Sequence, residues 1–325
     1  MVPGLLDRRT DPGTVPLVAE IQSEHMFASP TLVSTRETAA VLALMARGVV
    51  RWDRLAGAIE EEGSALRLLA QHDSDAQPQL FPVEGQRVTL DGLENYVHAL
   101  EEEGIHLMTV LDARYPVNLR MVHDRPPVLF VRGALDAHDE RSVAVVGTRK
   151  ATTEGLETAR AIARELVTAD YVVVSGLAAG IDTAAHTAAL EVGGRTLAVI
   201  GTGLREVFPR ANHALQQRIG IDAAVVSQFW PGQGPRRWTF PRRNAVMSGF
   251  ARATVVVEAS HTSGARMQAR LALEHGRPVF LSRSLLSHTW ARSYSSRPGV
   301  YVIDTGAQVV GHLDRLYADQ LTLVR

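Results

Sequence analysis

The sequence has 325 residues, of which 46% are hydrophobic, and it contains no cysteine. This length suffices for two domains, or for one large domain with an appended segment. The lack of cysteine excludes disulfides and thiolate metal sites and fits a reducing cytosol. Because Met1–Leu6 is not a signal-peptide pattern and no apolar run is long enough to span a bilayer, we expect a cytoplasmic protein with no membrane partner.

The charge is divided unevenly along the chain, although the formal net charge is only −1. Residues 1–140 carry 12 Arg and 22 acidic residues, a net of −10, whereas residues 141–325 carry 22 basic and 13 acidic residues, a net of +9. Between Pro231 and Val300, eleven Arg are opposed only by Glu258 and Glu274. Such an asymmetry predicts a polyanionic partner for the second half.

The amino-terminal part predicts a small helical region. Residues 1–33 contain four prolines and little periodicity, which indicates an irregular extension. Ser34 opens an apolar-periodic run that is typical of a capped helix, and further short helical patterns follow up to residue 70. Residues 71–88 read as a polar linker, so we expect a small helical domain and linker over 34–88. A helix is expected over 90–103, with Asp91 as its cap.

From residue 89 onwards the pattern is that of an α/β domain. Short apolar runs indicate strands over 105–110, 128–131, 142–146, 171–174, 196–200, 223–226, 253–257 and 279–281. Helical patterns lie between them, over 152–166, 181–190, 211–218 and 265–274. Apolar strands that alternate with helices predict a doubly wound, mostly parallel sheet covered on both faces, in a domain over 89–325.

Three glycine-containing loops follow three of these strands. They are Gly147-Thr148-Arg149, the loop Ser175–Gly180 with Ser175, Gly176 and Gly180, and Gly201-Thr202-Gly203. Carboxyl ends of parallel strands meet at one edge of the sheet, where ligands bind. Free amides at helix starts attract anions there, and Ser263-Gly264 opens a further helix of this kind. Each loop alone is equally well explained as an ordinary turn, but together they predict an anion-binding rim; no G-x-G-x-x-G motif is present.

A basic and aromatic cluster lies over residues 236–244. It contains Arg236, Arg237, Trp238, Phe240, Arg242, Arg243 and Asn244. Arginine forks suit phosphate oxygens and aromatic faces suit unstacked bases. Since no acidic residue lies between Asp222 and Glu258, we expect all four arginines to contact phosphates, and the aromatic residues favour those of a single strand.

The titratable side chains at this sheet edge favour a bracing role over catalysis. Asp182 is expected to cap its helix or to orient Arg149, and Glu258 to brace an arginine across the rim. Asp182 and His186 are spaced as a general-base or metal pair, but no third ligand or nucleophile lies at a recognisable spacing. Other histidines, such as His275, show no metal-ligand spacing. We therefore expect no catalytic residue, no metal and no cofactor.

The order of these motifs resembles the DNA-processing protein A (DprA/Smf) family over roughly residues 35–315. The matching motifs are Val145–Arg149, Ser175–Ala178, Gly180–Asp182, Ala185-His186, Gly201–Leu204, Phe208-Pro209 with Asn212, Phe240–Asn244, Val257–Ala259 and Ser263-Gly264, preceded by Tyr115-Pro116 and Pro126–Gly133. The resemblance implies an extended Rossmann-like domain that binds single-stranded DNA, forms a homodimer and loads a RecA-type recombinase in natural transformation, without being an enzyme. The strand-binding residues it implies are Arg149, the loops Ser175–Gly180 and Gly201–Gly203, and Phe240–Asn244.

The sequence departs from the family pattern at several positions. Ala179 and Ala245 stand where the family often has Arg, and Gln228 stands where an acidic residue is common. The segment 282–300 is unusual, and the carboxyl-terminal winged helix of many members is not expected. These departures indicate a divergent member.

Two other interpretations remain open from the sequence. The same sheet edge could serve a sensor or hydrolase of a nucleotide-derived small molecule, for example in phage defence, with Glu258 as the residue to test. Alternatively, the acidic half of one copy could contact the basic half of another in an interaction scaffold.

Overall fold

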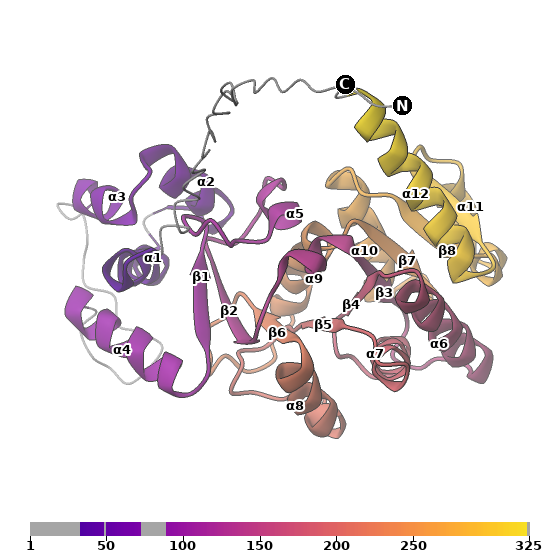
Figure 1. The fold of residues 1–325 in the computed structure, drawn as a ribbon, viewed down its shortest axis with the longest axis horizontal. Coiled ribbons are helices and arrows are strands. Elements are labelled where there is room, and N and C mark those ends of the chain that lie inside the picture. Colours follow the sequence, from indigo (N-terminus) through magenta and orange to yellow (C-terminus); the bar gives the residue numbers. More distant parts are fainter. Residues whose placement is uncertain (1–32, 49, 73–88, 324–325) are drawn as a thin grey trace, which may run out of the picture. The chain divides into compact units, whose positions relative to one another are not determined.

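The computed structural model describes residues 33–48, 50–72 and 89–323, with side chains up to residue 316 (Figure 1). The predicted extension over 1–33 and most of the predicted linker over 71–88 therefore lie outside the described residues. No helix in the described ranges is both long enough and apolar enough to cross a membrane.

Within the described ranges, four helices precede the sheet. They are α1 (Thr35–Arg47), α2 (Trp52–Glu62), α3 (Ala65–Gln71) and α4 (Leu90–Glu102). The predicted Ser34 cap of α1 is present, since its side chain accepts a hydrogen bond from the Glu37 amide. The Glu37 carboxylate in turn accepts from the Ala65 amide at 2.7 Å, which ties the start of α3 to α1. The cap of α4 is Thr89 rather than the predicted Asp91.

After these helices, the described strands form one nine-stranded sheet in the order β1-β2-β6-β5-β4-β3-β7-β8-β9. The strands are β1 (His106–Thr109), β2 (Val128–Gly133), β3 (Ser142–Val146), β4 (Val172–Ser175), β5 (Thr196–Val199), β6 (Ala224–Ser227), β7 (Ala253–Val256), β8 (Val279–Ser282) and β9 (Val300–Ile303). The strands from β3 to β9 are parallel, and β1 and β2 add an antiparallel edge. The predicted mostly parallel α/β sheet is confirmed.

The helices that connect or follow the strands are α5 (Val117–Arg120), α6 (Thr153–Thr168), α7 (Ile181–Glu191), α8 (His213–Asp222), α9 (Thr239–Phe250), α10 (Gly264–Glu274), α11 (Thr289–Ser295) and α12 (Gly306–Leu323). Helix α9 was not predicted, because Pro241 and paired arginines interrupt its apolar pattern. Pro241 lies in the first turn, where a backbone N–H has no partner within a helix, so the proline costs no helical hydrogen bond.

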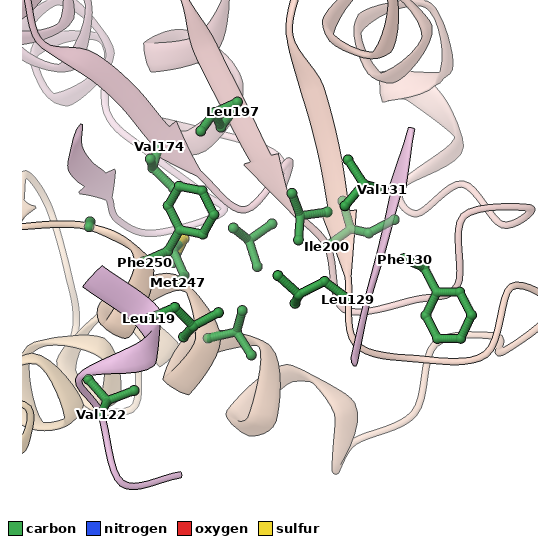
Figure 2. Packing of buried hydrophobic residues seen from close by; sticks show 14 of the residues in the cluster. Leu119, Val122, Leu129, Phe130, Val131, Val174, Leu197, Ile200, Met247 and Phe250 are labelled. Carbon is green, nitrogen blue, oxygen red and sulfur yellow. The ribbon is translucent and has the colours of Figure 1, made fainter. Parts of the chain in front are cut away.

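Both faces of the sheet are covered, as the apolar strands require. Along β3, Val143 and Val145 point into a core shared with α6, α7 and α12, whereas Ala144 and Val146 belong to a core that includes residues of α9 and α10. Figure 2 shows part of the second core, in which Met247 and Phe250 of α9 lie close to side chains of β2, β4 and β5. This packing fixes α9, and with it the basic cluster, against the sheet.

The strand order reverses between β3 and β7. From β3 the chain winds through β4 and β5 to β6, and it then returns to β7 on the other side of β3. Ligands of doubly wound folds bind beyond the carboxyl ends of the strands at such a reversal. Here the two strand ends are joined by a hydrogen bond from the Thr148 amide to the Glu258 carbonyl, 2.7 Å long.

Candidate nucleic-acid interface

An open cavity of about 410 Å³ lies at this reversal of strand order. Its lining includes the predicted residues Gly147, Thr148, Arg149, Asp182, Phe240, Arg243, Asn244, Ser263 and Gly264, together with Lys150. A smaller cavity of about 70 Å³ adjoins it and is lined by Gly176, Ala179, Gly201, Thr202 and Phe208, and again by Arg149, Phe240 and Arg243. The fold thus brings the three predicted loops and the start of α9 together at one edge.

Arg149 lies where the two cavities meet. Its guanidinium carbon is 5.0 Å from the ring centroid of Phe240 and 5.8 Å from that of Phe208. The two rings are themselves in contact, with centroids 5.7 Å apart. Arg149 and the neighbouring Lys150 are exposed, and neither forms an ion pair with any residue that the structure describes. Lys150 was not among the predicted site residues.

Arg243 differs in its surroundings from the other three arginines that were expected to contact phosphates. It is only 6% exposed, and its Nη1 donates to the carbonyls of Gly176 and Val199 at 2.6 and 2.9 Å. Its Nε donates to Asn244 Oδ1 at 2.9 Å. Burial lowers the pKa of the guanidinium, and the negative charge of Asp182 opposes this shift. Arg243 therefore joins α9 to the ends of β4 and β5, and most of its hydrogen-bonding capacity is used inside the protein.

Two glycines of the rim, Gly176 and Gly201, leave space for side chains of α9. A Cβ atom on Gly176 would lie 1.5 Å from Arg243 Nη1, and one on Gly201 would lie 2.8 Å from the Phe240 ring. Real Cβ atoms do not approach other atoms so closely. Since α9 supplies both of these side chains, the glycines that were predicted to admit an anion also admit this helix.

The Asp182 and His186 pair is not assembled as a catalytic or metal pair. The Asp182 carboxylate accepts from the amides of Gly176 and Ala178 at 3.2 and 3.4 Å, which is the predicted loop-bracing role. Burial raises the pKa of Asp182, and the positive charge of Arg243 opposes that rise.

His186 is fully buried in α7. Its Nδ1 lies 2.7 Å from Thr196 Oγ1, and this hydroxyl donates to the Val173 carbonyl. Burial lowers the pKa of His186 to about 3, and the nearby charge of Arg243 adds to this shift. A neutral, buried imidazole that joins α7 to β5 is a core residue, and its Nε2 has no hydrogen-bond partner among the residues described.

The remaining predicted rim residues contribute mainly to the framework. Ser175 is buried and donates to the Val145 carbonyl at 2.6 Å. Asn244 Nδ2 donates to the Gly264 carbonyl at 3.3 Å, and the Ser263 side chain caps α10. Gly180 precedes α7 and Gly203 lies against the carbonyls of Trp230 and Pro231. These contacts hold the amino ends of α7 and α10 at the sheet edge.

Glu258 braces the rim, but not through an arginine as predicted. Its Oε2 accepts from both the amide and the hydroxyl of Thr152, at 3.0 and 2.9 Å, and Thr152 in turn caps α6 through the Gly155 amide. Because Thr152 lies three residues after Arg149, this contact anchors the far end of the Arg149 loop. The prediction was wrong because sequence patterns give no distance between Glu258 and a loop more than a hundred residues away.

The other three arginines of the cluster are exposed near the start of α9. Arg236 and Arg237 precede the helix and lie outside both cavities. Arg242 lies between two indole rings, with its guanidinium carbon 5.0 Å from the centroid of Trp52 and 4.9 Å from that of Trp238. Partial burial lowers the pKa of Arg242. None of the three forms an ion pair within the described ranges, so their charge remains available to a polyanion.

His123, Asp124 and His275 form a cluster that the sequence spacing did not reveal, and it contacts Ser248 of α9. His275 Nε2 is 2.8 Å from Asp124 Oδ1 and its Nδ1 is 2.9 Å from Ser248 Oγ, while His123 packs edge-on against it. The arrangement superficially resembles a serine hydrolase relay. However, Ser248 is completely buried and donates to the Ala245 carbonyl, so it is placed to join helices and not to attack a substrate.

Comparison with known proteins agrees with this geometry. The profile of the family described as DNA recombination-mediator protein A matches residues 106–320, which is well over half of the chain. The chain belongs to this family. DNA processing protein DprA of Streptococcus pneumoniae is 44% identical over 172 residues, which are 53% of this chain and 61% of that protein. Protein Smf of Synechocystis is 38% identical over 200 residues, which are 60% of this chain and 50% of that protein.

The solved structures of relatives support the fold. The structure of DNA processing protein A from Streptococcus pneumoniae is 31% identical, with a TM-score of 0.66 over 86% of this chain and 98% of that one. A Helicobacter pylori structure, titled for its single-stranded DNA binding mode, is 24% identical with a TM-score of 0.57 and covers 64% of this chain and 96% of that one. The expected DprA/Smf relationship and Rossmann-like fold are confirmed. The sequence matches span only about half to three fifths of the two relatives named above.

Proposed function

We propose that this protein binds single-stranded DNA along the carboxyl edge of its sheet. The observation that carries the proposal is Arg149, which is exposed, has no ion-pair partner in the described ranges and is stacked over Phe240 where the two cavities meet. An arginine fork placed over an aromatic ring can contact a phosphate while the ring stacks on a base. The Helicobacter pylori relative, which is described as binding single-stranded DNA, has the same fold.

The distribution of charge supports a strand and not only a small ligand. Arg236, Arg237 and Arg242 continue the basic surface beyond the cavities at the start of α9. A single strand presents a phosphate at every nucleotide, so each unpaired cation along its path adds affinity by releasing counterions. Duplex DNA keeps its bases stacked and withholds them from Phe240 and Phe208. We therefore expect single strands to bind more tightly than duplexes.

The rest of the proposed role follows the family. We propose that the protein protects single-stranded DNA, acts as a homodimer in the cytoplasm without enzymatic turnover, and helps to load a RecA-type recombinase in transformation or recombination. The family description, DNA recombination-mediator protein A, supports this role. We also propose that residues 34–88 form a small helical domain with its linker and that residues 89–325 form the DNA-binding domain.

A binding comparison tests the proposal directly. Fluorescence anisotropy with a labelled oligodeoxythymidine and with a duplex of equal length should show tighter binding of the single strand at low salt. The matched variants are Arg149→Ala, which should weaken binding, and Arg297→Ala, which should not. Arg297 is a suitable control because it is exposed and lies over Tyr294 at 4.2 Å, but it precedes β9 at the opposite edge of the sheet. Equal affinity for both DNA forms, or no binding at low salt, would reject the proposal.

A second candidate function uses the larger cavity alone. Its place at the reversal of strand order, and its 410 Å³ volume, suit a small phosphate-bearing ligand such as a nucleotide. Glu258 is the acidic group to test in this reading, although its carboxylate is already bound to Thr152. A nucleotide retained by the purified protein, or turnover of a nucleoside monophosphate that is lost in Glu258→Gln, would favour this function over strand binding.

A further inference from the structure

We propose that a third pocket beside the start of α9 receives one unstacked base of the same DNA strand. This pocket, which we call the Trp52–Gln228 pocket, has a volume of about 310 Å³. It lies between α1–α2 and the segment after β6, and its lining includes Met45, Trp52, Leu55, Gln228, Trp238 and Arg242. The inference rests on the proposed function and adds to it a base-binding role for the amino-terminal helices.

Gln228 carries a buried side-chain amide at this pocket. It directly follows β6 and is 4% exposed, yet neither its Nε2 nor its Oε1 has a hydrogen-bond partner among the described residues. Two other buried amides do have partners: Asn212 Nδ2 donates to the Leu177 carbonyl at 2.8 Å, and Gln216 Nε2 donates to the Glu206 carbonyl at 3.1 Å. A buried polar group without a partner is costly, so a complete donor and acceptor pair without partners points to a ligand.

The chemistry of that pair fits a nucleobase. A carboxamide presents one donor group and one acceptor side by side. The Watson–Crick edge of every base carries a donor next to an acceptor, and glutamine is known to pair with a base edge through both groups at once. A free phosphate would need donors only, and an aliphatic ligand would leave the amide unsatisfied. Gln228 therefore selects a planar ligand with alternating donors and acceptors.

Two tryptophans, Trp52 and Trp238, line the same pocket. Trp52 and Trp238 both lie about 5 Å from the Arg242 guanidinium, and Trp238 remains 48% exposed. Trp238 is held from the side by Phe229, with centroids 5.6 Å apart and ring planes at 78°. An indole offers the largest stacking face of any side chain to an unstacked base. Arg242 has no ion pair in the described part of the chain, so it is available to turn toward the phosphate of the base that stacks there.

The position of the pocket joins it to the proposed DNA path. Phe240 lines the cavities at the strand reversal, and Arg242 lines the Trp52–Gln228 pocket, although only Pro241 lies between them on α9. Both places lie beyond carboxyl ends of parallel strands, at β3 in one case and at β6 in the other. A strand that follows the amino end of α9 would pass from one to the other. The helices α1 and α2 would then contact DNA directly.

The test compares a DNA strand that has bases with one that lacks them. Affinities of wild type, Trp52→Leu and Trp52→Phe are measured for oligodeoxythymidine and for an abasic phosphodiester strand of the same length. Trp52→Leu should weaken binding of oligodeoxythymidine roughly tenfold, which corresponds to the stacking of one base. It should leave abasic-strand affinity unchanged, and Trp52→Phe should restore most of the affinity. Gln228→Met should produce a smaller decrease, of a few fold, again confined to the strand with bases.

A second measurement does not depend on variants. Oligonucleotides that carry 5-iododeoxyuridine are irradiated in complex with the wild-type protein, and the cross-linked peptides are mapped by mass spectrometry. Cross-links to Trp52 or Trp238 support the inference. If the wild type binds oligodeoxythymidine but cross-links map only to Phe208 and Phe240, and Trp52→Leu binds as the wild type does, the inference is wrong while strand binding stands. If the wild type binds neither strand, the proposed function itself fails.

Discussion

Arg242 and Arg243 are neighbours in one motif, but they belong to two different regions of the molecule. Arg243 lies in a buried framework with Asp182 and Asn244, where it donates to backbone carbonyls at the ends of β4 and β5. Arg242 is exposed, as are Arg149 and Lys150; its guanidinium lies over two indole rings and forms no ion pair in the described ranges. Within the basic cluster, Arg243 therefore holds α9 against the sheet, and only the exposed arginines offer a surface for an anion. Equal charge in a sequence does not mean equal availability.

The largest difference between the two regions should appear in stability. Arg243→Ala should lower the free energy of unfolding by about 3 kcal/mol, because two buried carbonyls lose a charged donor and Asp182 loses its nearby positive charge. Arg242→Ala should lower it by less than about 1 kcal/mol, which is the scale of an exposed cation–π contact. Urea unfolding monitored by circular dichroism measures both. If the free energy of unfolding decreased by a similar amount in both variants, Arg243 would have no greater structural role than Arg242.

The framework should also respond to pH through His186. Its pKa is about 3 in the folded protein against an ordinary value of 6.5, so the folded state binds fewer protons than the unfolded state between these values. The contribution of the neutral His186 to the free energy of unfolding is fully present above pH 6.5 and is lost as the pH falls towards 3. From pH 7 to pH 5 the decrease due to His186 should be about 2 kcal/mol.

The His186→Gln variant isolates this contribution. It removes the titrating group, while other groups such as Asp182 titrate equally in both proteins. Wild type and variant should therefore differ in the slope of unfolding free energy against pH between 7 and 5, with the variant flatter. Parallel curves for the two proteins would show that His186 is accessible to protons in the folded state.

Much of the sheet could be predicted from the sequence, because fully apolar runs of strand length occur at regular intervals. The loops Gly147–Arg149, Ser175–Gly180 and Gly201–Gly203 were likewise expected at one edge, and the structure brings residues of all three to the two adjoining cavities. The helix α9 was missed because its buried face includes Arg243 and Asn244, whose polar groups are satisfied by partners far away in the chain. Periodicity of apolar residues cannot detect a face that is buried through hydrogen bonds.

The roles of single residues were harder to predict than their location. Glu258 was expected to hold an arginine and holds Thr152, and Arg243 was expected to contact a phosphate and donates to two buried backbone carbonyls. Both outcomes depend on distances between segments that are far apart in sequence. Lys150 and Trp52 were not singled out, since a lysine beside a motif and a tryptophan in a short helix have no distinctive spacing. The unpaired amide of Gln228 could be seen only once the surrounding segments were in place.

The exposed rim should show the smallest effect on stability and the clearest effect on binding. The double variant Arg149→Ala/Lys150→Ala removes two exposed cations without ion pairs in the described ranges, so its unfolding free energy should change by less than about 0.5 kcal/mol. The decisive measurement is the slope of log Kd against log salt concentration for a single-stranded oligonucleotide. We predict that the double variant reduces this slope by about 1.4, or about 0.7 for each phosphate that the protein no longer neutralises. Arg297→Ala should leave the slope unchanged. An unchanged slope in the double variant, or an equal reduction in Arg297→Ala, would contradict binding of the strand at this rim.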